Sequence, residues 1–305
     1  MIRTLQAHES SSLPAGEADF LLAASAAHAG DSPGKRLIAP ARDAEYISTG
    51  NVFSAGASAD MTPALFTRAV HTLTPFTAVK ILDLGLTAKP QQCTVIDFGI
   101  EAVPGIGETA PLDAKALFEK GRHFGRTYKP VGDYVILAES IPADTPTADA
   151  AVAALGTLAS GMSLFEKLGQ TADTILMFTA GFVLEACRRF PVVLGGGKRM
   201  AAALLIANRI VRRDGLPMDP RKITLCTARS AADNENTNPA ALLEQLDFRP
   251  RSLYADLPAD DTAVASLCLY DDSAGAGAAI AYGYMHGLTY AQIIDRAQAL
   301  MPGGS

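Results

Sequence analysis

The chain has 305 residues, of which 49% are hydrophobic and 19% charged, and its net charge is −6 at pH 7. This length predicts one large domain, or a domain with a smaller lobe, with an ample core. The negative charge gives no support for nucleic acid or an anionic membrane as a partner. The four cysteines form no CxxC and the five histidines no HxxxH or HExxH pair. The sequence therefore predicts free thiols in a reducing cytoplasm and no metal site.

Strands and helices are predicted to alternate along most of the chain. A first strand is expected over 20–24, and residues 32–62 are rich in Gly, Pro, Ser and Asp, which is typical of a long loop region or a small lobe. The later predicted strands are 78–84, 94–98, 134–138, 191–194, 222–227, 252–255 and 266–270. The predicted helices are 63–74, 112–127, 144–159, 171–190, 198–213, 239–246, 275–286 and 289–301. This alternation predicts a three-layer α/β fold with a mostly parallel sheet, whose ligands bind where the strands end.

The helix 171–190 is the most apolar long stretch, but it carries four charged residues, so we interpret it as a buried helix and not as a membrane span. A more informative segment follows it. Gly195, Gly196 and Gly197 separate a short strand from a helix that opens with Lys198 and Arg199. Cations at a helix N-terminus are unfavourable unless an anion is bound there too. The segment predicts a cradle for phosphate or carboxylate, and a tight glycine turn with two solvated basic side chains is an equal alternative.

Glu139 directly follows the strand 134–138, which predicts a partly buried carboxylate over the pocket. Asp144 or Thr145 can then cap the next helix. The alternative is a structural helix start in which Glu139 pairs with an arginine, and the residues alone slightly favour it.

Two carboxylates, Asp271 and Asp272, and Ser273 follow the predicted strand 266–270, before a run of small residues that begins at Gly275. Helix capping explains the acidic residues. A general base above a wall kept small for a flat ligand also explains the glycines, which are unfavourable in a helix, and this cost favours the functional interpretation. Arg229 and Asp233, after the strand 222–227, are weaker candidates for substrate contact or for a structural ion pair.

Three strand exits, 132–148, 192–203 and 271–281, together resemble those of the nicotinate-nucleotide–dimethylbenzimidazole phosphoribosyltransferases. The segments 41–50 and 116–126 also match the archaeal and cyanobacterial-type branch of this family, so the resemblance spans most of the chain in order. It implies transfer of phosphoribose from nicotinate mononucleotide to a benzimidazole-like base, with release of nicotinate, for the lower ligand of cobamides. The expected partners are a small nucleotide and an aromatic base, and no cofactor is implied.

The resemblance also implies one domain over 1–305, usually in a homodimer. Within that domain, a Rossmann-like core is expected over 63–286 and a small lobe is expected from both chain ends, 1–62 and 287–305. It places the general base at Asp272 and an acceptor-orienting role at Glu139. The residues and the resemblance together give as candidate substrate- and phosphate-binding residues Gly195, Gly196, Gly197, Lys198, Arg199, Asp144, Thr145, Ser273, Gly275 and Arg229.

Several residues depart from the family pattern. Asp144 replaces a glycine where backbone N–H groups would meet phosphate, Lys198 and Arg199 are new, and Asp272 is one methylene shorter than the family's glutamate. A Ser- and Asn-rich segment is missing after Leu155. These departures keep a second hypothesis open, a non-catalytic relative that binds a nucleotide or a cobamide precursor. A nicotinamide-dependent oxidoreductase ranks last, because the GxGxxG fingerprint is absent.

Overall fold

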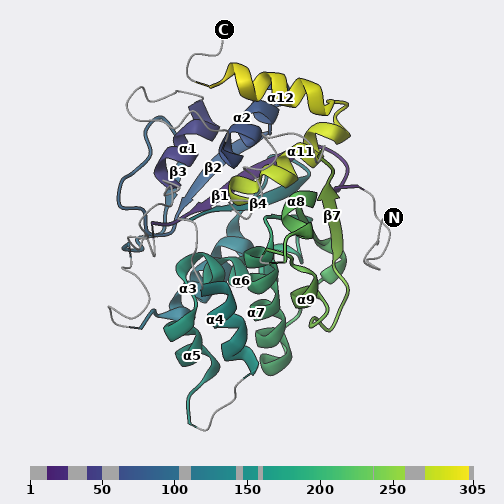
Figure 1. Cartoon of the computed structure of the whole chain (residues 1–305). Helices are drawn as coiled ribbons and strands as arrows, with labels where there is room; N and C mark the ends of the chain where they lie inside the picture. Colours follow the sequence, from purple (N-terminus) through teal and green to yellow (C-terminus); the bar gives the residue numbers. More distant parts are fainter. Residues whose placement is uncertain are drawn as a thin grey trace.

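Parallel strands form one sheet through the centre of the molecule (Figure 1). The computed structural model describes residues 12–26, 40–49, 62–102, 111–141, 147–156, 161–235, 237–257 and 272–301. Its strands are β1 (Ala18–Ala24), β2 (Ala78–Asp83), β3 (Val95–Asp97), β4 (Tyr134–Ser140), β5 (Val192–Gly195), β6 (Ile223–Ala228) and β7 (Arg251–Ala255). Within these residues the strand order is β3-β2-β1-β4-β5-β6-β7, and every pairing between neighbours is parallel.

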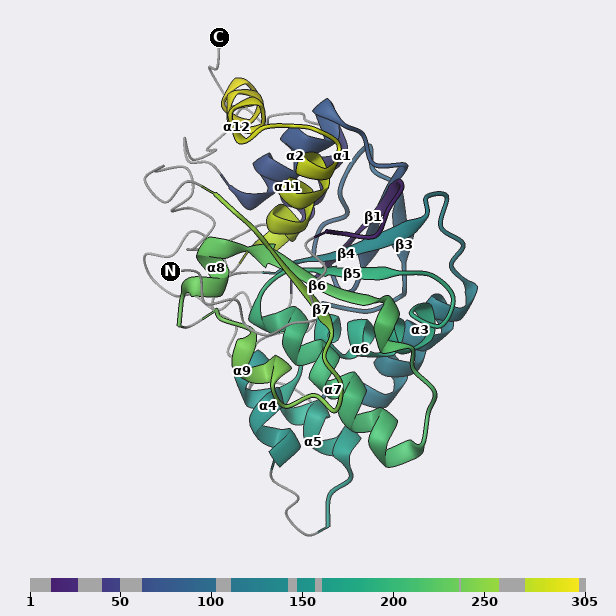
Figure 2. The same ribbon diagram turned by 90° about the vertical axis from the view of Figure 1, so that its right-hand side faces the viewer.

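Helices cover both faces of the sheet, as two views at right angles show (Figures 1 and 2). One layer consists of α3 (Ala114–Thr127), α4 (Thr147–Gly156), α5 (Leu164–Thr171), α6 (Thr174–Ala186), α7 (Lys198–Asp214) and α9 (Ala240–Leu243). The other consists of α1 (Pro40–Thr49), α2 (Pro63–Leu73), α11 (Ala276–Met285) and α12 (Tyr290–Ala299). The short helix α8 (Arg229–Asp233) follows β6 directly, and single 3-10 turns span Pro220–Lys222 and Ser273–Gly275. The predicted three-layer α/β fold is confirmed.

The central strands are apolar on both faces because each face is covered by helices. Leu21 of β1 and Leu137 of β4 are register partners, and both pack toward the layer of α3, α6 and α7. Their neighbours Phe20 and Ile136 are also partners, and they pack toward α2 and α11. The continuous runs of apolar residues in these strands are thus divided between two hydrophobic cores.

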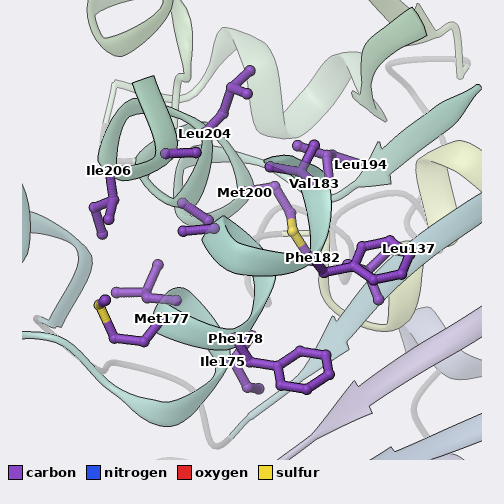
Figure 3. Packing of buried hydrophobic residues seen from close by; sticks show 14 of the residues in the cluster. Leu137, Ile175, Met177, Phe178, Phe182, Val183, Leu194, Met200, Leu204 and Ile206 are labelled. Atoms are coloured by element: carbon purple, nitrogen blue, oxygen red, sulfur yellow. The ribbon is translucent and has the colours of Figure 1, made fainter. Parts of the chain in front are cut away.

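Helix α6 lies in the middle of its layer and is buried along its whole length. Its side chains pack against those of α7 and of the strands (Figure 3). It lies very close to α3, because two glycines face backbone carbonyls: a Cβ at Gly181 would stand 2.0 Å from the oxygen of Phe118, and one at Gly121 would stand 2.1 Å from that of Phe178. Such close approach leaves no room for a side chain at either glycine.

The sheet reverses its direction of growth between β1 and β4, since β1 leads on to β2 at one side and β4 to β5 at the other. In doubly wound sheets, ligands bind beyond the carboxyl ends of the strands at this switch point. The strand ends at Ala24 and Ser140 therefore lie where this fold is expected to bind a ligand.

Two expectations differ from the structure. The predicted core boundary at residue 63 is wrong for β1, which lies at the centre of the sheet and not in a peripheral lobe. The segment 40–49 lies in the predicted loop region, yet it forms α1, which packs on α2 and β1. The predicted strand 266–270 lies outside the described residues. Among those described, no helix is both long and apolar enough to cross a membrane.

Candidate functional site

Three chain segments that are far apart in the sequence meet at the carboxyl edge of the sheet. A Cβ placed on Gly196, just after β5, would stand 3.4 Å from Oε1 of Glu139 at the end of β4. One placed on Gly195 would stand 3.5 Å from the Cα of Gly275. Ser273 donates a hydrogen bond of 3.5 Å from its hydroxyl to the Glu139 carbonyl. The predicted meeting of the exits of β4, β5 and the 272–275 turn is therefore observed.

A buried arginine joins the strand end to three helix starts. Arg199, in the first turn of α7, donates from Nε to Glu139 Oε2 at 2.9 Å and from Nη2 to Asp173 Oδ2 at 2.6 Å. Its Nη1 donates to Thr147 Oγ1 at 2.9 Å, and that hydroxyl donates to Asp173 at 2.5 Å. Asp173 is the N-cap of α6 and also accepts from the N–H of Leu176. One guanidinium thus connects β4 with the starts of α4, α6 and α7.

The surroundings change the pKa values of the groups in this network in different directions. Burial raises the pKa of Glu139, and the opposing effect of Arg199 only partly offsets it. Burial alone would also raise the pKa of Asp173, but Arg199, Thr147 and the Leu176 N–H together lower it. The two carboxylates raise the pKa of Arg199 although burial acts against this. Arg199 therefore stays protonated, and Asp173 is its firmer partner.

The predicted anion at the start of α7 is supplied by the protein itself. Arg199 is held by Glu139 and Asp173, and Nζ of Lys198 lies 2.6 Å from Oδ1 of Asp149. Gly197 is the N-cap residue between β5 and these cations. Because acidic side chains already balance both cations, the inference that they require a bound phosphate is wrong for Arg199 and loses its basis for Lys198. The alternative pairing of Glu139 with an arginine is what the structure contains.

Asp272 is completely buried, and the protein occupies both of its oxygens. Its Oδ2 accepts from the hydroxyl of Thr227 at 2.8 Å and from the N–H of Ala228 at 3.0 Å, while Oδ1 accepts from the N–H of Gly277 at 2.7 Å. Burial raises its pKa to about 7 against these hydrogen bonds. This carboxylate fixes the start of α11 to the end of β6, so the geometry does not support its predicted position above an acceptor ring.

The small residues before α11 are explained by close packing. A Cβ on Gly275 would stand 2.5 Å from Cβ of Ala138, and one on Gly277 would stand 2.1 Å from the nitrogen of Ala228. Gly275 also has a φ of 64°, and Asp272 at 54° shares this left-handed region, which is unusual for a residue with a side chain. The glycines therefore let the turn and helix rest directly on the strand ends, and a wall for a flat ligand is not needed to explain them.

The remaining predicted site residues lie elsewhere. Arg229 pairs with Asp256, and its guanidinium carbon lies 5.6 Å from the centre of the Tyr254 ring, so it sits at the β6–β7 side of the sheet. Asp144 and Thr145 lie outside the described residues. Within the residues described, no group of three or more His, Cys, Asp or Glu side chains is placed to hold a metal ion.

Sequence reasoning missed a polar group at the switch point itself. Ser140, the last residue of β4, donates its hydroxyl to Oδ2 of Asp43 on α1 at 2.6 Å. Next to it, Ser25 donates its N–H to the Ser140 carbonyl at 3.1 Å and accepts a hydrogen bond from the hydroxyl of Thr174 at 3.1 Å. Burial raises the pKa of Asp43 to about 6, although Ser140 and Arg42 act to lower it. In the sequence, this group was indicated only by the polar residues at the ends of the two central strands, Ser140 at the end of β4 and Ser25 directly after β1.

Comparisons with known proteins agree with this architecture. No family model matches the chain. It is 28% identical over 258 residues to a UPF0284 protein of Halobacterium salinarum, covering 72% of this chain and 74% of the relative. It is 25% identical over 303 residues to a UPF0284 protein of Archaeoglobus fulgidus, covering 88% and 86%. These names state no activity.

Two solved structures from Thermus thermophilus share the fold. One is a nicotinate-nucleotide-dimethylbenzimidazole phosphoribosyltransferase, with a TM-score of 0.52 and 18% identity over 93% of this chain and 82% of that one. The other is described as CobT, with a TM-score of 0.56 and 17% identity over 93% and 83%. The resemblance predicted from the sequence is confirmed for the fold, which this chain shares with both structures.

Proposed function

We propose that this protein transfers the phosphoribosyl group of nicotinate mononucleotide to a benzimidazole-like base and releases nicotinate. The observation that carries the proposal is the meeting of Glu139, Gly196 and Ser273 at one edge of the sheet. These residues come from the three segments that resemble the transferases, and the edge adjoins the switch point where such folds bind ligands.

The reaction needs anion contacts, a slot for the aromatic base and a proton acceptor. Helix α4 begins at Thr147, on the same edge, and the positive end of its dipole favours a phosphate nearby. In this proposal Glu139, fixed by Arg199, keeps a constant orientation toward the acceptor base. Substrate binding at this edge would then need little rearrangement of the strand end.

A second candidate is a binding protein without catalysis. It is favoured by the hydrogen bonds that occupy both oxygens of Asp272 and by the pairing of Glu139 with Arg199. Neither carboxylate can then accept a proton without giving up a partner. The two candidates share a ligand class and differ in whether a glycosidic bond is broken.

The decisive experiment is to incubate the protein with nicotinate mononucleotide and a panel of benzimidazoles, purines and phenols, and to measure free nicotinate. We expect release with at least one benzimidazole, and a slower release in Glu139→Gln. Asp247→Asn, on the surface pair with Arg212, is the matched control and should keep the wild-type rate. Calorimetric binding of the nucleotide without any release would favour the binding protein, and absence of both would refute both candidates.

The homodimer implied by the resemblance is also a proposal. Light scattering coupled to size-exclusion chromatography tests it directly, because one chain has a mass of 31.9 kDa. A single species near that mass would refute it.

A further inference from the structure

The carboxylates at this edge of the sheet differ in how much of their hydrogen-bonding capacity is already used. Glu139 and Asp173 share the guanidinium of Arg199, and Asp272 accepts three hydrogen bonds from the protein. All three side chains are buried, with at most 3% of any of them exposed. A group that takes a proton from a ligand must be able to reach it.

Asp43 is arranged differently. It accepts one hydrogen bond, from the Ser140 hydroxyl to Oδ2, and no described residue donates to its Oδ1. The residue is only partly buried. Helix α1 packs on β1 and α2, which places Asp43 beside the end of β4 at the switch point. Ser140 is itself fully buried, so its hydroxyl holds the carboxylate in one orientation and leaves the second oxygen available.

We propose that Asp43 is the general base of the transfer reaction and accepts the N–H proton of the incoming aromatic base. This inference rests on the proposed function. The unprotonated nitrogen of the base attacks the ribosyl C1′, and the C1′–nitrogen bond to nicotinate breaks. The electron pair of that bond neutralises the pyridinium as nicotinate leaves. The cationic ring that forms then loses its N–H proton to Oδ1 of Asp43, so atoms and charge balance.

The surroundings of Asp43 suit this role. Burial raises its pKa to about 6, nearer to neutral pH than an exposed aspartate, and a base works best when its pKa lies near the working pH. Arg42 is the charged neighbour on the same helix and acts in the opposite direction. Arg68 of α2 faces the other end of α1, where it donates to the carbonyls of Ile47, Ser48 and Thr49. Because the residue as a whole is not fully buried, the proton can return to solvent after each turnover.

The first test compares Asp43→Asn with Asp272→Asn, and uses Glu45→Gln, on the same helix, as the control. Nicotinate release is measured from pH 5 to pH 8 with a benzimidazole acceptor. We expect wild-type kcat to fall on the acidic side of a pKa near 6. Asp43→Asn should lower kcat about a hundredfold and remove that acidic limb, while the affinity for nicotinate mononucleotide stays within about threefold. The proposal would be overturned if Asp43→Asn kept the wild-type kcat and its decrease at acidic pH, while Asp272→Asn lost both.

A second test does not depend on turnover. Benzimidazole and 1-methylbenzimidazole are titrated into the wild type and Asp43→Asn by calorimetry. Because 1-methylbenzimidazole has no N–H to donate, we expect the variant to weaken benzimidazole binding at least tenfold and to leave the methylated compound unchanged. Equal effects on both compounds, or no binding of benzimidazole to the wild type, would refute the role of Asp43. Absence of nicotinate release alongside the selective binding loss would refute only the proposed reaction.

Discussion

Replacing Arg199 with methionine should destabilise the protein by about 4 kcal/mol at pH 8. The exposed fractions are 7% for Arg199, 2% for Glu139 and 1% for Asp173, so the change leaves two carboxylates buried without their cation. Methionine keeps most of the volume of the side chain, which separates loss of charge from loss of packing. Removal of one partner from a buried ion pair costs about 3–5 kcal/mol, out of a total stability of about 5–15 kcal/mol.

The loss should shrink as the pH falls to 5. Without Arg199 the pKa values of both carboxylates rise above their unfolded values, so the folded variant binds protons before the unfolded chain does. Its stability therefore increases as the pH decreases. In the wild type the pKa of Asp173 is lowered, so the contribution of this residue persists at pH 5 and is lost only at lower pH. The difference between the two proteins should thus be largest at neutral and alkaline pH.

Urea unfolding followed by far-ultraviolet circular dichroism measures these energies, since the chain has no tryptophan for fluorescence. Arg212→Met is the matched control: it lies on the same helix, and its partner Asp247 is exposed, so a change of at most about 1 kcal/mol is expected. Adding Glu139→Gln to Arg199→Met should restore part of the lost stability. A loss below about 1 kcal/mol in Arg199→Met, or one that is the same at pH 5 and pH 8, would refute this account of the network.

Three further predictions concern contacts of helices with strands and with each other. Asp272→Asn should weaken folding by about 1–3 kcal/mol at pH 5, because its NH2 group turns two hydrogens toward protein donors, whereas the protonated carboxyl of the wild type has only one. Between pH 5 and pH 8 the free energy of unfolding of the wild type should fall by roughly 2–3 kcal/mol more than that of this variant, because the pKa of Asp272 in the folded protein, about 7, lies above its unfolded value. Equal decreases for the two proteins in urea titrations would contradict this prediction. Gly277→Ala should destabilise the protein by about 1–3 kcal/mol or more, because the new Cβ would stand 2.1 Å from the backbone nitrogen of Ala228. The control Gly283→Ala should be nearly neutral, because its Cβ would approach only the ends of side chains, the nearest at 3.2 Å. Thermal unfolding measures both effects. Gly181→Ala should separate α6 from α3 with a comparable loss, and an unchanged melting temperature would show that the contact with Phe118 yields easily.

The sheet was predictable from the sequence because its strands are short runs of Val, Ile and Leu between turns. Strand β1 was located correctly, but its place in the centre was not, since order in a sheet depends on contacts between distant segments. Helix α1 was missed because its segment carries polar residues and lies among turn formers. Its stability comes from packing on α2 and from Arg68, which caps its last carbonyls.

The candidate site was predicted as a place and only in part as a set of contacts. The rule that ligands bind at strand ends directed attention to Glu139 and Gly196, which the structure brings together. The contacts of Arg199 with Asp173 and of Asp43 with Ser140 were not predictable. Arg199 meets Asp173 from 26 residues away, and Asp43 meets Ser140 from 97 residues away, so neither pairing leaves a periodic or local trace. Glycines that indicated a ligand wall in the sequence proved to be contact points between backbones.

The arginine network has a consequence for how this protein can diversify. Glu139 precedes the segment 142–146 and Thr147 follows it, and both bind the same guanidinium. The two anchor points of that segment are therefore fixed relative to each other, whatever sequence connects them. Changes in the residues of this segment should therefore leave the strand before it and the helix after it in place, provided that the Arg199 contacts are kept.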